Sequence, residues 1–124
     1  MDISKYIDII KINSQTKDDS FLDYLANEGI FDLPSFENLI EALEVLKINI
    51  EGIVDNNALD FRIILQDLYM IDRICLILIS SHFDPQDKYV IKTTVIDQNN
   101  LSSYIYQVDQ AIFTLQKSLF EKIH

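Results

Sequence analysis

The stretch "FENLIEALEVLKINIEGIVD", residues 36 to 55, has apolar residues that recur every three or four positions. This spacing places them along one side of an α-helix and predicts a single helix over residues 35 to 54. Asp32 or Ser35 is the expected N-cap, and Pro34 falls in the first turn, where its missing N–H costs nothing. The apolar positions predicted to face the core are Phe36, Leu39, Leu43, Leu46, Ile50 and Ile53.

The other side of this predicted helix is acidic. Its carboxylates fall within about 80° of one another, and Ile48 points outward among them. Like charges at this spacing repel by a few tenths of a kcal/mol per pair, and only Lys47 lies nearby to offset them. A helix that served packing alone would more often alternate acids with lysines, so we predict a partner-binding face. Its residues are Glu37, Glu41, Glu44, Ile48, Glu51 and Asp55, with Tyr24, Phe31 and Tyr69 as expected aromatic neighbours.

The net charge of −10 is concentrated in the middle of the chain. Residues 18 to 72 contain 13 acids against Lys47 and Arg62, whereas residues 1 to 17 carry +1 and residues 73 to 124 carry no net charge. Such a surface repels phosphates, so direct nucleic-acid binding is not expected. A basic protein partner would be attracted.

The rest of the chain predicts further helices in an all-α, single-domain bundle of about five to six helices, residues 1 to 124. A helix after "SSHF" would begin at "DPQD", where Asp is a plausible N-cap and Pro the first helical residue. The alternative is an α+β fold with a hairpin from residues 73–81 and 88–97, which are rich in β-branched residues. The other expected helices cover residues 3–12, 18–29 between an acid or Ser20 and Gly29, 58–80, and 101–123.

The last of these helices has two apolar rows. Leu101, Ile105, Val108, Ile112, Leu115, Leu119 and Ile123 form the expected core row. Tyr106, Phe113 and Phe120, spaced by seven residues, form a second row beside it. Aromatic side chains left exposed in register invite a partner helix, so these three residues are candidates for self-association in a homodimer.

The single cysteine and the lengths of the apolar runs limit the class of protein to which this chain can belong. Cys75 is the only cysteine and lies inside the apolar run "ICLILI", which predicts a core position and excludes an internal disulfide. The N-terminus has no apolar block of the length that a signal peptide needs, and no run is long enough to span a membrane. A cytoplasmic protein without membrane association is therefore expected.

No constellation of residues predicts catalysis. Glu41 and Glu44 lie one turn apart, as in helical metal sites, but residues 57 to 72 contain no glutamate to complete such a site. Arg73 and His82 are too widely separated to act together from one helix. We therefore expect no catalytic residue, no metal and no cofactor, and a binding protein in preference to an enzyme.

The stretch "LPSFENLIEALEVL", residues 33 to 46, resembles the acidic inhibitory helix of barstar-type ribonuclease inhibitors. The resemblance is confined to these residues, without the Gly-Glu-Asn and Trp features of that family, so the chain is not assigned to it. The leading hypothesis is a small acidic inhibitor, of the immunity-protein or antitoxin kind, that occludes a basic nuclease or another nucleic-acid-processing protein. The alternatives are an acidic dimeric secretion chaperone and, third, an enzyme of unrecognised type.

Overall fold

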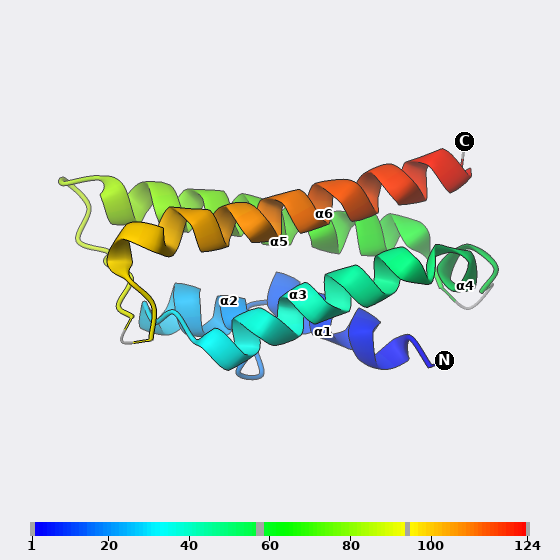
Figure 1. Ribbon diagram of the computed structural model, residues 1–124, viewed down its shortest axis with the longest axis horizontal. Coiled ribbons are helices and arrows are strands. Elements are labelled where there is room, and N and C mark those ends of the chain that lie inside the picture. The colour runs from blue at the N-terminus through cyan, green and yellow to red at the C-terminus, as the bar shows by residue number, and fades with distance from the viewer. Residues whose placement is uncertain (1, 57–58, 94, 124) are drawn as a thin grey trace.

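The computed structural model describes residues 2–56, 59–93 and 95–123. α1 packs against α3 and α5, and α6 also packs against α3 and α5, so the four helices form a ring. Figure 1 shows α5 and α6 side by side as one layer, with α1 and α3 in the other. The all-α bundle predicted from the sequence is confirmed. The four long helices are α1 (Ser4–Ser14), α3 (Leu33–Ile48), α5 (Phe61–Phe83) and α6 (Leu101–Ile123).

Short helical elements occupy the connections. The predicted caps are present: Ser20 Oγ accepts the backbone N–H of Asp23 at 3.2 Å, and Asp32 Oδ2 accepts that of Ser35 at 3.0 Å. Gly29 ends the second helical segment in the left-handed region, at φ 64°, which glycine adopts without steric cost. The connecting elements are α2 (Phe21–Asp23), the π-helix η1 (Tyr24–Glu28), α4 (Ile50–Val54) and the 3₁₀-helix η2 (Gln98–Asn100).

α3 ends earlier than the sequence predicts. The backbone N–H of Asn49 and its side-chain amide both donate to the carbonyl oxygen of Val45, at 3.0 and 2.8 Å. The backbone of Asn49 leaves the helical region, with φ −104° and ψ 32°. Asparagine side chains compete with helical hydrogen bonds in this way. The prediction of one helix over residues 35–54 is therefore wrong, although Ile50 and Ile53 are buried as expected.

α5 is longer than predicted and no helix follows it directly. The helix expected over residues 58–80 continues through "SSHF" to Phe83, so those residues are not a link. The helix predicted to begin at "DPQD" does not form. Asp84 and Asp87 instead accept the backbone N–H groups of Gln86 and Tyr89, at 2.9 Å each, and so stabilise turns.

The segment after these turns is extended and lies against the bundle. The N–H of Phe31 donates to the carbonyl oxygen of Lys92 at 2.9 Å, forming part of an isolated parallel bridge. The N–H of Ile91 donates to Nδ1 of His82, also at 2.9 Å, and Ile91 is buried. These tertiary contacts outweigh the local signature of a helix start. The alternative hairpin from residues 73–81 and 88–97 does not form in the parts of these ranges that are described.

One apolar cluster joins all the long helices. Its aromatic part holds Phe21, Phe31, Phe36 and Tyr104, whose neighbouring ring centroids lie 5.2 to 5.5 Å apart, mostly edge to face. Cys75 is buried in the core as predicted, and burial raises the pKa of its thiol. The core row of α6 is buried as expected at Leu101, Ile105, Val108, Ile112, Leu115 and Leu119, while the side chain of Ile123 lies outside the described residues.

Candidate functional site

The outer side of α3 carries the glutamates that the sequence assigns to partner binding. Glu37, Glu41 and Glu44 are exposed, and Ile48 at the end of the helix is 82% exposed. None of the three glutamates forms an ion pair with a residue that the structure describes. These four residues are named the acidic face of α3. Along the helix they span about 16 Å, and they place unpaired negative charge beside one large apolar side chain.

Glu51 and Asp55 do not continue this face along one helix. Both are exposed, but Glu51 belongs to α4, and Asp55 follows it directly. Figure 1 shows α4 turned away from the line of α3. Glu51 also forms an ion pair with Lys122 of α6, and the hydrogen bond between them raises the pKa of Lys122. The charge of Glu51 is therefore partly offset within the chain.

A second group of carboxylates surrounds Tyr24, close to the start of α3. Negative charge raises the pKa of the Tyr24 phenol, with Asp19 as the largest cause, followed by burial and by Asp32, Glu28 and Asp23. From the sequence, Tyr24 was predicted only as an aromatic neighbour of Ile48. The five residues come together because Asp32 caps α3 while the others belong to the turn and helix before it.

The other aromatic residues expected near Ile48 lie elsewhere. Phe31 is buried in the aromatic part of the core, so its assignment to a binding surface is wrong. Tyr69 is exposed on α5, which lies in the opposite layer of the bundle from α3 (Figure 1).

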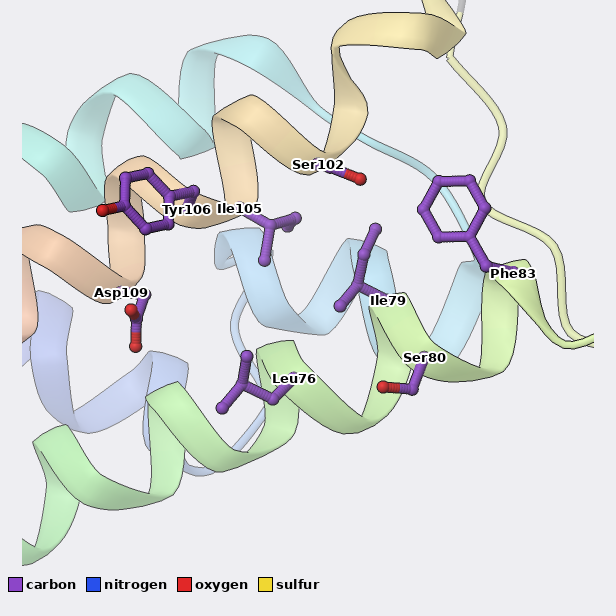
Figure 2. A pocket seen from close by; sticks show the side chains of 8 residues that line it. All are labelled: Leu76, Ile79, Ser80, Phe83, Ser102, Ile105, Tyr106 and Asp109. Carbon is purple, nitrogen blue, oxygen red and sulfur yellow. The ribbon is translucent and has the colours of Figure 1, made fainter.

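The predicted aromatic row of α6 is exposed and has a counterpart on α5. The row on α5, which sequence analysis did not single out, consists of Tyr69, Leu76 and Phe83, also spaced by seven residues. The six side chains are 47% to 61% exposed. A cavity of about 400 Å³ lies in the groove between the two helices. Figure 2 shows Leu76 and Phe83 of α5 on one side of it and Tyr106 of α6 on the other.

A carboxyl pair lies at the middle of this groove. Burial, followed by the hydrogen bond and the charge of Asp109, raises the pKa of Asp72 to about 7. Oδ1 of Asp72 is shielded from solvent, and no described residue donates a hydrogen bond to it. The sequence places Asp72 on an otherwise apolar side of its helix. The structure explains that placement, because Asp72 faces Asp109 across the groove.

The remaining chemistry of the described residues is limited. Their His, Cys, Asp and Glu side chains form no group of three or more that could hold a metal ion. His82, at the end of α5, accepts the N–H of Ile91 and thereby positions the segment after the helix. None of the described helices is both long and apolar enough to cross a membrane.

Comparisons with known proteins identify no relative of this chain. No protein family model matches it, and no curated protein or solved structure shows significant similarity to it.

Proposed function

We propose that this protein is a small acidic inhibitor, of the immunity-protein or antitoxin kind, that binds a basic nuclease or another nucleic-acid-processing protein. The acidic face of α3 (Glu37, Glu41, Glu44 and Ile48) is the docking surface. The bound partner loses access to nucleic acid because the carboxylates occupy positions where its basic groups would otherwise hold phosphates.

One observation carries this proposal: three exposed glutamates lie on one side of α3 without an ion pair to any described residue, while the other side of the helix is buried in the core. Mutual repulsion of these charges costs the free protein stability. A positively charged partner would remove that cost. It would also be steered toward the surface, since a field of one sign raises association rates by about 10 to 10³-fold at low salt.

Ile48 supports the same proposal because an exposed apolar side chain can supply binding energy. Binding energy at protein interfaces is concentrated in apolar or aromatic anchors ringed by polar groups, and charged groups at the rim mainly set the association rate and the choice of partner. Ile48 is the most exposed of the large apolar side chains described, at 82%. Its position at the end of the row of glutamates matches that arrangement.

The secretion-chaperone alternative favours a strand hairpin from residues 73–81 and 88–97 and uses the aromatic row of α6 for dimerisation. The described parts of this segment contain the end of α5, turns and one isolated bridge instead. The hairpin support for the chaperone is therefore lost, while the exposure of Tyr106, Phe113 and Phe120 is compatible with a dimer of either class.

The experiment is a pull-down with tagged protein from the native cell, at low and high salt, analysed by mass spectrometry. The test variant carries Glu37→Lys, Glu41→Lys and Glu44→Lys together. The matched control carries Asp8→Lys, Asp84→Lys and Glu121→Lys, which make the same change in net charge at exposed positions away from α3. Circular dichroism establishes that all three proteins keep their helical content.

The expected result is a basic protein that wild type and control both capture at low salt and that the α3 variant does not. Once that partner is purified, adding wild-type protein should suppress its nuclease or nucleic-acid-binding activity. Equal capture by all three proteins, or a captured partner whose activity is unaffected, would contradict the proposal.

A further inference from the structure

Two apolar rows flank the groove between α5 and α6, and both follow a seven-residue repeat. The rows are Tyr69, Leu76 and Phe83 on α5 and Tyr106, Phe113 and Phe120 on α6, and together they are named the groove face. A repeat of seven keeps a row of side chains on one side of a helix that packs against another helix at a small left-handed crossing angle. Both rows lie apart from the core rows of the same helices, which are buried.

Five of the six residues of the groove face, all except Phe120, line hollows that share residues with one another. Leu76 lines both the cavity that holds Phe83 and Tyr106 and a neighbouring hollow that holds Tyr69 and Ile77. Asp72 and Asp109 join these hollows to a third one, which includes Phe113. The groove therefore runs between the two helices with the carboxyl pair at its middle, and Ser80, Ser102, Gln110 and Gln116 contribute polar groups to its lining.

The exposed area suits an interface between two proteins. The groove face together with Ile77 is exposed by 47% to 61% per residue. With about 200 Å² for each fully exposed side chain, these residues leave on the order of 750 Å² of largely apolar surface open. Single chains rarely leave more than about 300 to 600 Å² in one apolar patch, and a stable complex buries about 800 Å² on each partner.

The groove holds a pair of carboxyl groups, and an arginine borders it. Asp72 and Asp109 lie together at its middle, where burial and then the neighbouring Asp109 raise the pKa of Asp72. Arg73 follows Asp72 directly and borders the same hollow. It is exposed and forms no ion pair within the described chain. A two-fold axis at the level of Asp72 and Asp109 would bring Arg73 of each copy over the carboxyl pair of the other.

We propose that the groove face binds a second copy of this chain, forming a two-fold symmetric dimer in which the α5–α6 layers of the two copies pack against each other. Symmetric pairing of identical surfaces is the commonest form of association in soluble proteins. The contact involves α5, which carries two arginines and two aspartates, and α6, which carries two lysines, one aspartate and one glutamate. Neither helix therefore has a net charge, which limits repulsion between two copies of an acidic chain. The acidic face of α3 lies in the other layer, so the dimer would present two docking surfaces, and the proposal does not depend on the function proposed for that face (Figure 1).

Analytical ultracentrifugation of the purified protein from about 1 to 100 µM, a range that covers weak and strong complexes of this size, tests the proposal. Wild type should sediment as a dimer at the upper end of the range. Leu76→Glu and Phe113→Glu should each weaken association by at least tenfold. The control is Ile63→Glu, which changes an exposed apolar residue of the same helix about 140° around its axis from Leu76 and should leave association unchanged.

A charge exchange tests the alignment of the two copies without altering the apolar rows. Arg73→Asp should weaken association by at least tenfold, and addition of Asp109→Arg to the same chain should restore most of the loss. Circular dichroism establishes that each variant remains helical. Wild type that stays monomeric at 100 µM would overturn the proposal and leave the groove face to another partner. Equal association of wild type, Leu76→Glu and Phe113→Glu would overturn it as well.

Discussion

Replacement of Asp72 by asparagine should stabilise the protein above neutral pH and remove most of the pH dependence of its stability between pH 5 and 8. The pKa of Asp72 rises from 3.8 to about 7 on folding, because the carboxyl is shielded in the α5–α6 groove and faces Asp109. Between these values the folded state holds a proton that the unfolded state has lost. The free energy of unfolding must therefore fall as pH rises through this window.

The size of the effect follows from the interval between the two pKa values. An interval from 3.8 to about 7 corresponds to at most about 4 kcal/mol of lost stability at high pH. Because the carboxyl borders an open groove, solvent screens its charge, and we expect about 1 to 2 kcal/mol. Asparagine stays neutral at every pH and can donate a hydrogen bond to Asp109, so Asp72→Asn should gain this amount at pH 8 and little at pH 4.5.

Urea unfolding followed by far-UV circular dichroism, at several pH values from 4.5 to 8.5, measures this difference. The protein should be dilute enough to sediment as a single monomeric species. Asp8→Asn serves as a control for net charge, because Asp8 is exposed on α1, and it should keep the wild-type pH profile. Wild-type stability that rises from pH 5 to 8, or an Asp72→Asn variant with the wild-type slope, would refute the explanation.

Three further predictions concern residues that hold the bundle and its acidic surface. The Tyr24 phenol should titrate above pH 10 in an ultraviolet absorbance titration. Asp19→Asn should move the pKa of Tyr24 back toward its ordinary value, since Asp19 is the largest cause of the shift. A titration curve that Asp19→Asn leaves unchanged would argue against that cause. Gly29→Ala should lower the free energy of unfolding by about 1 to 3 kcal/mol. The reason is that a Cβ at this left-handed position would lie 2.9 Å from the carbonyl oxygen of Val90. An unchanged free energy of unfolding, measured with urea, would show that the segment around Val90 can move aside. Asn13→Ala should cost about 1 to 3 kcal/mol in the same assay, since the buried Asn13 accepts the N–H of Leu22 at 3.0 Å. Asn13→Asp keeps that acceptor but loses the amide that donates to the carbonyl oxygen of Ile9 and buries a carboxylate, so it should cost at least as much.

The apolar periodicity of the sequence was sufficient to predict most of the fold. The buried row of α6 and the inner side of α3 follow from spacing alone, because a helix in a bundle must bury a continuous stripe. The caps at Ser20 and Asp32 and the stop at Gly29 were equally accessible, since each depends on the residue's own side chain or backbone freedom.

The predictions were wrong where long-range contacts, or hydrogen bonds from a side chain to the nearby backbone, outweighed a sequence pattern. "DPQD" has the residues of a helix start, but the segment after it is held in an extended form by His82 and by the backbone of Phe31. The break in α3 depends on Asn49, whose side-chain amide donates a hydrogen bond to the carbonyl oxygen of Val45. Apolar residues on both sides of Asn49 conceal this break from an analysis of periodicity.

Of the candidate surfaces, the sequence predicted the residues that share one helix but not those that the fold brings together from different segments. Spacing along one helix identified Glu37, Glu41 and Glu44, because they share a side of α3. The cluster of acids around Tyr24 required the fold, since Asp19 and Asp32 belong to different local segments, before and after Gly29, that the fold brings to the same side chain. The α5 row beside the aromatic residues of α6 was present in the sequence as Tyr69, Leu76 and Phe83, but α5 is apolar on several sides, and only exposure distinguishes this row from the core.

The central claim is that the acidic face of α3 recruits a basic partner by electrostatic attraction. Its most direct test is the association rate of the purified partner, measured by stopped-flow mixing over a range of salt concentrations. The account predicts that the wild-type rate falls steeply as the Debye length shortens from about 30 Å at 0.01 M to about 8 Å at 0.15 M salt. The Glu37, Glu41 and Glu44 triple lysine variant should associate at least tenfold more slowly at low salt, while the Asp8, Asp84 and Glu121 control stays close to wild type. A wild-type rate that is insensitive to salt and equal to that of the α3 variant would contradict the claim.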